Sequence, residues 1–277
     1  MELQELREEI TALTLTDSAN RLDAAVALRP ELAGMRFFDP PLVGCAAADD
    51  PIFAQMQSDP KIIGEVFRTP REWLPGAKSV ISLFFPKTEA VRKSNYDGSE
   101  PSAEWLHARI EGQEFLKYAI HTLKRRLEEA GYHAVVPFYT PDFTIRANTD
   151  DPALPGIASS WSERHVAFAA GLGTFGLAKN LITEKGDAGR LASLVTDAEF
   201  APTPRRYAEP YEYCTFCGAC ARRCPVEAID PERGKDIFTC KAHVEKQKLA
   251  YAPRYGCAKC QLRVPCETGI PGKKNKL

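Results

Sequence analysis

The most informative stretch of the chain is the cysteine run Cys214-Thr-Phe-Cys217-Gly-Ala-Cys220-Ala-Arg-Arg-Cys224-Pro225. Intervals of two residues let a tight loop bring successive thiolates to separate irons of one cubane, while backbone N–H groups point at the sulfurs. The fourth cysteine is followed by proline and directs the chain away, and such a thiolate serves a second cubane where two are present. The spacing therefore predicts two [4Fe-4S] clusters.

Four later cysteines bring the total in this region to the eight thiolates that two cubanes need: Cys240, Cys257, Cys260 and Cys266. We expect the first cluster to be bound by the set Cys214, Cys217, Cys220 and Cys266. We expect the second cluster to be bound by the set Cys224, Cys240, Cys257 and Cys260. An exchange of Cys240 and Cys266 between these sets stays open. Cys45 lies alone in an apolar stretch and is expected to be a buried core residue without a role in chemistry.

Disulfides and zinc are the alternative uses of so many cysteines. A disulfide framework is typical of small secreted chains, whereas this chain opens with the charged sequence Met-Glu-Leu-Gln-Glu-Leu-Arg-Glu-Glu-Ile and no apolar signal segment. Zinc favours two separated Cys-x-x-Cys pairs and does not account for consecutive steps that end in Cys-Pro. The pattern therefore favours iron–sulfur clusters in a reducing cytoplasm.

Length and charge limit the kind of protein. A chain of 277 residues can form one large domain and a small one, each with its own core. With 36 Lys and Arg against 37 Asp and Glu, the net charge of -1 gives no electrostatic case for wholesale nucleic-acid binding. No run approaches the roughly 18 apolar residues of a membrane span. We expect a soluble, cytoplasmic protein without membrane contact.

Hydrophobic spacing predicts an α/β layer ahead of the cysteines. Apolar residues at helical intervals predict an amphipathic helix over about the first fifteen residues. The apolar runs 79–85 and 134–139 predict buried strands, and a long helix between them is expected to end at Gly131. Residues 190–197 predict a last strand, whereas residues 140–156, rich in Pro, Asp and Thr, predict an irregular loop.

The prolines that follow residue 201 indicate a linker into the cysteine-rich part. We therefore expect an α/β domain at residues 1–204, which would bind the cofactor. Residues 205–277 are expected to form a ferredoxin-like domain with two [4Fe-4S] clusters. The basic tail from Pro271 to Leu277 is expected to be a solvated end.

A glycine-rich motif precedes the linker. The sequence Ser160-Trp-Ser-Glu163 matches a capping box that opens a short helix ending at Gly171. The following Gly171-Leu-Gly173-Thr-Phe-Gly176 matches G-x-G-x-x-G, but it follows a helix rather than a strand, so a dinucleotide site is not expected. Its bare backbone can lie against a flat ligand or a cluster, or form a merely structural turn. The candidate cofactor contacts are Gly171, Gly173, Gly176 and Asn180.

Together these motifs resemble the epoxyqueuosine reductase and cobalamin-dependent reductive dehalogenase superfamily, over roughly residues 160 to 266. The similar segments are Ala170 to Gly176, Leu181 to Thr183, Arg190-Leu191, Thr196-Asp197 and Tyr255-Gly-Cys257-Ala-Lys-Cys260-Gln261. The resemblance implies a flavoreductase-like α/β sandwich followed by the ferredoxin-like domain. It also implies a corrinoid (cobalamin) held between the two and reduced by the nearer cluster.

Four features differ from this family. Epoxyqueuosine reductases carry an acid, thought to donate a proton, at the position that corresponds to about Ile157. We do not expect the additional C-terminal helical-repeat domain of the tRNA-modifying enzymes, and the last cysteine interval is Cys260-x5-Cys266 rather than three residues. We do not expect the twin-Arg signal of respiratory dehalogenases either. Recognition of tRNA is therefore not expected, although it is not excluded.

We expect an oxidoreductase in which the two clusters deliver electrons to a corrinoid that reduces an unknown small molecule. The alternatives are a non-catalytic electron carrier or corrinoid-reducing accessory protein, and a compact epoxyqueuosine reductase acting on tRNA. A low-potential ferredoxin or flavodoxin would be the electron donor. No catalytic residue is predicted outright, and the available proton-handling side chains are Tyr139, Asp142, Glu163, Arg164 and His165. Capping for Glu163, a turn for Asp142 and ordinary packing for Arg164 and His165 are their structural alternatives.

Overall fold

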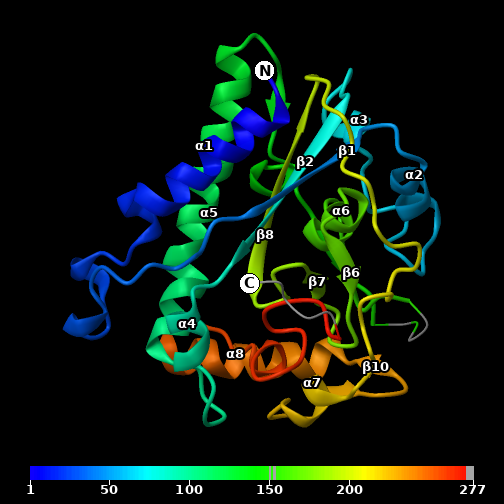
Figure 1. The fold of residues 1–277 in the computed structure, drawn as a ribbon. Helices are drawn as coiled ribbons and strands as arrows, with labels where there is room; N and C mark the ends of the chain where they lie inside the picture. Colours follow the sequence, from blue (N-terminus) through cyan, green and yellow to red (C-terminus); the bar gives the residue numbers. More distant parts are fainter. Residues whose placement is uncertain (150, 152–153, 273–277) are drawn as a thin grey trace.

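The computed structural model describes residues 1–149, 151 and 154–272 of the chain. Its centre is a four-stranded antiparallel sheet with the strand order β1-β2-β8-β3. The strands are β1 (Leu42–Ala47), β2 (Ser79–Pro86), β8 (Gly189–Thr196) and β3 (Ala134–Val135). Strand β2 is buried along its whole length, since helices cover both faces of the sheet (Figure 1).

One face of the sheet is covered by α1 (Leu3–Thr16) and α5 (Ala103–Glu129). The side chain of Ser102 caps α5 by accepting a hydrogen bond from the N–H of Trp105. Aromatic rings join helix to sheet, because Phe115 stacks on Phe38 with ring centroids 6.1 Å apart and meets Phe85 edge-on at 5.8 Å. The core on this face therefore holds α5 rigidly against β2 and β8.

The opposite face is covered by α2 (Pro51–Ser58), α3 (Pro70–Trp73) and α6 (Glu163–Ala169). The fully buried ring of Trp161 stacks on Phe67 at 5.9 Å between ring centroids. Helix α6 approaches β1 closely, because a Cβ at Gly44 would lie 2.2 Å from the carbonyl oxygen of Ala170. The sheet is thus the middle layer of a helix–sheet–helix sandwich (Figure 1). The remaining short helices here are η1 (Ser18–Asn20), η2 (Ala24–Val26), η3 (Pro30–Leu32) and α4 (Glu89–Ser94).

The long elements predicted from the sequence are confirmed, and two local predictions are wrong. The expected strand 134–139 stops at Val135, and residues Pro137–Tyr139 form a 3-10 turn (η4), because proline has no N–H to continue the ladder. The stretch 140–156, expected to be irregular, contains β4 (Ile145–Ala147), which pairs with β5 (Ile157–Ser159). Residues 150, 152 and 153 of that stretch lie outside the described residues.

After α6, the hairpin of β6 (Gly173–Phe175) and β7 (Leu181–Thr183) leads back to β8. The cysteine-rich segment, defined here as residues 205–272, lies below the sheet (Figure 1). Its elements are α7 (Ala219–Arg222), β9 (Ile229–Asp230), β10 (Gly234–Lys235), α8 (Ile237–Tyr251) and η5 (Lys259–Gln261). The tail beyond residue 272 lies outside the described residues.

Charged side chains fix the cysteine-rich segment to the α/β layer. Glu267 accepts a hydrogen bond from Arg92 Nε at 3.1 Å, and Arg254 donates to Glu111 at 2.5 Å. The buried Lys259 ammonium donates to three oxygen atoms of residues 95 and 97 at the end of α4. These contacts place the cysteines in a defined position relative to the sheet. Within the described part of the chain, every helix falls short of the length and apolar character that crossing a bilayer requires.

Candidate functional site

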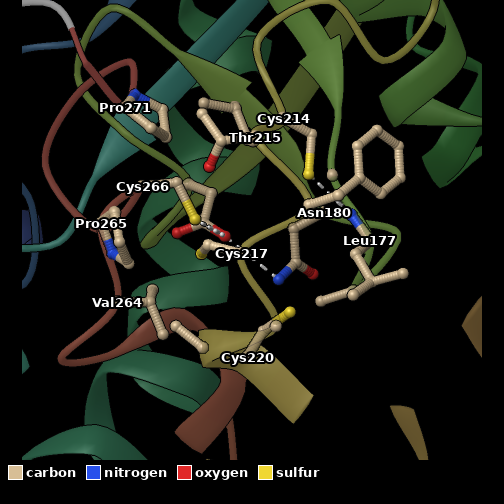
Figure 2. Close-up of a pocket in the computed structure, with 17 residues that line it drawn as sticks. Leu177, Asn180, Cys214, Thr215, Cys217, Cys220, Val264, Pro265, Cys266 and Pro271 are labelled. Atoms are coloured by element: carbon tan, nitrogen blue, oxygen red, sulfur yellow. Dashed lines mark hydrogen bonds between the residues drawn. The ribbon is translucent and has the colours of Figure 1, made fainter. Parts of the chain in front are cut away.

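Four cysteines of the predicted first set line one small cavity (Figure 2). Cys214, Cys217 and Cys220 come from the loop that precedes and enters α7, and Cys266 faces them from the last described loop. The loop turns sharply because Phe216 and Gly218 both adopt left-handed backbone conformations, with φ of 50° and 68°. The backbone N–H of Leu177 donates to Cys214 Sγ at 3.4 Å, the kind of hydrogen bond that tunes a cluster sulfur.

The other four cysteines form a second group. Charge interactions link Cys257 with Cys240 and Cys224, and Cys260 with Cys257 and Cys240. In contrast, Cys266 interacts with Cys220 and Cys214 of the first group. These interactions place Cys240 near Cys257 and Cys260, and Cys266 near Cys214 and Cys220; the division of the eight cysteines into two ligand sets stays a prediction. Their ligation of iron stays a prediction.

The chemistry of these two groups fits iron–sulfur cubanes. Burial raises the pKa of the Cys260 thiol to about 12 and raises that of Cys266 further, so each thiol keeps its proton until a metal replaces it. Among the described residues, no three Cys, His, Asp or Glu side chains converge on a single point as the ligands of one zinc ion must. Each ligand of a cubane instead binds its own iron atom. Four thiols spread around one cavity suit the cubane.

A buried carboxyl lies in the wall of the first cavity. Asp187 is 4% exposed, accepts a hydrogen bond from Asn180 Nδ2 at 3.3 Å and lies 3.7 Å from Cys266 Sγ. Burial raises the pKa of Asp187 well above its usual range. The sequence alone did not indicate this residue, because its role depends on Cys266, 79 positions later in the chain.

A cluster of arginines lies on the α/β side of the second cysteine set. Strand β3 pairs only with Val195 and Thr196 of β8, so Arg190, near the other end of β8, lies beyond it. Arg190 donates to Gln113 Oε1, and Gln113 Nε2 donates to Tyr139 Oη at 2.5 Å. We name as the arginine cluster the set that hydrogen bonds and charge interactions connect at this place: Arg109, Gln113, Tyr139, Glu163, Arg164, Arg190 and Tyr255.

Glu163 is the acid of the arginine cluster. Its carboxylate accepts a hydrogen bond from Ser193 Oγ at 2.6 Å, and Ser193 Oγ accepts one from Trp161 Nε1 at 2.8 Å. Burial raises the pKa of Glu163 to about 7, although Ser193 and Arg190 act in the opposite direction. Glu163 can therefore hold a proton near neutral pH and release it, which is what a general acid must do.

The predicted capping role of Glu163 is wrong. Helix α6 has Ser162 as its N-cap, without a side-chain capping bond, and Glu163 turns toward β8 instead. Ser160, the other member of the expected box, bonds to Thr144. Glu163 does not cap the helix because its carboxylate accepts a hydrogen bond from Ser193 of β8 instead.

The other proton-handling candidates lie in different surroundings. Asp142 is exposed and lies 3.8 Å from Arg68, and no acid stands at Ile157, which lies in β5. His165 packs on Phe175 with ring centroids 4.8 Å apart, and desolvation lowers its pKa to about 4, so it is neutral at pH 7. Arg164 keeps solvent-accessible surface, although desolvation lowers the pKa of its guanidinium group. The guanidinium group interacts by charge with Cys260 and Cys240. Arg164 is therefore the member of the arginine cluster that lies next to the second cysteine set.

The candidate cofactor-binding glycines fall into two environments. Gly171 has φ of +78° and ends α6, as expected, and a Cβ at Gly173 would lie 2.0 Å from the carbonyl oxygen of Ile182. Gly176 and Asn180 line the first cysteine cavity. A direct contact of these four residues with a cofactor stays a prediction. Cys45 is fully buried in the core, as the sequence indicated.

The class of protein follows from these observations. A 4Fe-4S binding domain model matches residues 210–230, the loop that carries the first cysteines. The chain has a mixed α/β fold and a segment that matches a 4Fe-4S binding domain; part of its sequence is similar to reductive dehalogenases, and its fold is similar to that of epoxyqueuosine reductases.

Tetrachloroethene reductive dehalogenases resemble part of the sequence. That of Desulfitobacterium hafniense is 33% identical over 108 residues, which cover 34% of this chain and 20% of that protein. That of Dehalobacter restrictus is 39% identical over 74 residues, which cover 26% of this chain and 13% of that protein. The similar part therefore spans a fifth or less of the length of these curated relatives.

Solved structures share the fold over nearly the whole chain. A crystal structure of epoxyqueuosine reductase gives a TM-score of 0.52 at 18% identity and covers 98% of this chain and 68% of that one. The catabolic reductive dehalogenase NpRdhA in complex with 3-bromo-4-hydroxybenzoic acid gives 0.53 at 15% identity, covering 98% and 37%. The resemblance predicted from the sequence is confirmed at the level of the fold.

Proposed function

We propose that this protein is a corrinoid-dependent reductase in which two [4Fe-4S] clusters deliver electrons to a cobalamin bound between the α/β layer and the cysteine-rich segment. The supporting observation is the position of the arginine cluster, whose Arg164 interacts by charge with Cys260 and Cys240. Strand β3 does not cover the part of β8 that carries Arg190, and this edge therefore offers charged side chains to a bound cofactor and substrate. A reductive dehalogenase of similar fold catalyses B12-dependent dehalogenation.

The eight cysteines would hold the clusters, and the protein tunes them through backbone donors. Leu177 N–H donates to Cys214 Sγ at 3.4 Å, and Ala228 N–H donates to Cys224 Sγ at 3.2 Å. When bound, cubanes carry single electrons at low potential and a corrinoid supplies a strongly reducing cobalt centre. The remaining chemistry belongs to side chains, of which Glu163 holds a proton near neutral pH and Tyr139 is fixed by Gln113.

Metal analysis of protein purified without oxygen, followed by reconstitution with cobalamin, tests the proposal. We expect about eight irons per chain, about one cobalt after reconstitution, and altered absorption and EPR spectra of the added cobalamin. Unchanged cobalamin spectra would contradict the proposal and favour the alternative of a non-catalytic electron carrier. A preparation with zinc in place of iron would contradict both.

A complementation experiment in cells tests the alternative of a tRNA substrate. One structural relative was solved with an epoxyqueuosine-modified tRNA stem loop. If this chain restores queuosine in a strain that lacks its own epoxyqueuosine reductase, its substrate is tRNA rather than a small molecule. We expect no restoration, and a ferredoxin or flavodoxin as the electron donor in a cytoplasmic setting.

A further inference from the structure

Two half-buried arginines at the junction lack an acidic partner. Arg109 donates to Tyr255 Oη at 3.1 Å and lies over that ring, 4.6 Å from its centroid. Arg190 donates to the neutral amide of Gln113. Within the described ranges, neither guanidinium has a carboxylate oxygen within 4.0 Å. By contrast, Arg92 and Arg254 at the same junction are each paired with a glutamate.

The two unpaired guanidinium groups lie close to each other. Arg109 and Gln113 are four residues apart and share one face of α5, and the amide of Gln113 is the acceptor for Arg190. The nitrogen of the same amide donates to Tyr139 Oη, so Gln113 connects Arg190 to Tyr139. Both arginines are half-buried. Desolvation, and next the charge of Arg109, lower the pKa of Arg190 to about 9. Two desolvated like charges with only neutral acceptors are costly unless an anion joins them.

Negative charge from the proposed second cluster does not account for both arginines. Arg164 interacts by charge with Cys260 and Cys240, so a cluster bound there would compensate it. The charge neighbours of Arg190 include other cations, tyrosines and Glu163, but no cysteine. Glu163 is half-protonated near pH 7 and is engaged by Ser193. The pair Arg109 and Arg190 therefore stays short of negative charge.

We propose that Arg109 and Arg190 form an oxyanion site that binds a carboxylate or phosphate group beside Glu163. The guanidinium group presents paired N–H donors that match the two oxygens of such an anion, and a partly desolvated setting strengthens each hydrogen bond. This inference deepens the proposed function. The identity of the anion rests on that proposed function, whereas the existence of the site does not. The anion belongs either to the small-molecule substrate, which is then an organic acid or phosphate ester, or to the nucleotide phosphate of the corrinoid.

Titration calorimetry under anaerobic conditions tests the site with inorganic phosphate and benzoate as probes. The protein carries its clusters but no corrinoid, so the outcome does not depend on corrinoid binding. We expect saturable binding to the wild type and at least about tenfold weaker binding to Arg190→Gln and Arg109→Gln, since each removes a charge-assisted contact. Arg190→Lys keeps the positive charge but loses the paired N–H donors of the guanidinium group. Its affinity for the probes should therefore lie between the affinities of the wild type and of Arg190→Gln.

The matched control is Arg125→Gln, because Arg125 lies on the same helix but is exposed beside Glu129. This variant should bind both probes like the wild type. Unchanged cluster absorption and thermal midpoints show that every variant is folded. Equal probe affinity in wild type, Arg190→Gln and Arg109→Gln, or no saturable binding of either probe to the wild type, would overturn the proposal.

Cobinamide, which lacks the nucleotide phosphate of cobalamin, identifies the source of the anion. If Arg190→Gln weakens cobalamin binding about tenfold and leaves cobinamide binding unchanged, the site holds the corrinoid phosphate. If both corrinoids bind wild type and variant alike, and benzoate still binds in the presence of cobalamin, the site holds the substrate. Failure of every corrinoid to bind would contradict the proposed function while the oxyanion site remains established by the probes.

Discussion

The two cysteine sets differ in exposure and in the charges around them. Cys217 of the first set is exposed, and the titratable group beside Cys266 is the buried carboxyl of Asp187, whose raised pKa favours its neutral form. In the second set no cysteine is exposed, and the neighbouring groups are Asp187 together with the cations Lys259, Arg164 and Lys235. Positive charge stabilises the reduced, more negative state of a cluster, so the second cluster should have the higher reduction potential.

This difference gives the proposed electron path a direction. An electron donor can approach the first cluster at exposed Cys217, and the arginine cluster lies beside the second. Electrons then move from the lower to the higher potential, toward the place where Glu163 holds a proton. The asymmetry follows from side chains that the cysteine spacing alone does not specify.

The largest expected effect comes from removing one proposed ligand of either set. Cys214→Ser and Cys260→Ser should each lower the iron content from about eight to about four per chain, because each disables one cubane. Iron and sulfide analysis of anaerobically purified protein measures this. Cys45→Ala is the control, since Cys45 is buried in the apolar core, and should keep all the iron. Loss of all iron in both ligand variants would mean that the sets are not independent.

A second prediction concerns the residue that anchors the first set's last cysteine. Glu267 is buried and accepts hydrogen bonds from Arg92 Nε at 3.1 Å, Tyr96 Oη at 2.7 Å and Arg263 N–H at 2.7 Å. Glu267→Leu leaves Arg92 buried without its partner, which should cost about 3–5 kcal/mol. Anaerobic thermal and chemical denaturation measures the loss. Glu199→Leu is the control, because the exposed pair Lys78–Glu199 should contribute less than about 1 kcal/mol.

The sequence predicted the parts of this molecule that depend on local spacing. The cysteine intervals indicated the cluster loop, and apolar periodicity indicated α1, α5, β2 and β8. It did not predict the arginine cluster, because Arg109, Arg190 and Tyr255 come from three distant segments and carry no common motif. The sequence predicts that Glu163 caps the helix, because its actual partner, Ser193, lies 30 residues later and no local pattern indicates that contact. The domain boundary at residue 204 and the number of clusters stay predictions.

A third prediction concerns Glu163, the acid of the arginine cluster beside the second cysteine set, and uses its raised pKa. Its pKa of about 7 exceeds the ordinary 4.5, so the folded protein binds more protons than the unfolded chain between these pH values. The contribution of Glu163 to stability is present below pH 4.5 and falls by up to about 3 kcal/mol as the pH rises through 7. Thermal midpoints between pH 5 and 8 should decline less steeply in Glu163→Gln. Equal slopes would show that the carboxyl titrates normally. Glu65→Gln, at an exposed ion pair, is the control.

The smallest expected effect measures the charge asymmetry itself. Lys259 is 1% exposed and its ammonium lies beside Cys257, held by oxygen atoms of residues 95 and 97. At an effective dielectric constant of about 20, unit charges about 8 Å apart interact by about 2 kcal/mol, roughly 90 mV for a one-electron couple. Lys259→Met should therefore lower one of the two cluster potentials by about 50–100 mV in an EPR-monitored redox titration and leave the other nearly unchanged. Lys61→Met, at an exposed lysine after α2, should move neither. Equal shifts of both potentials would mean that Lys259 acts through the packing of the whole segment, and the proposed direction of electron flow would lose its electrostatic basis.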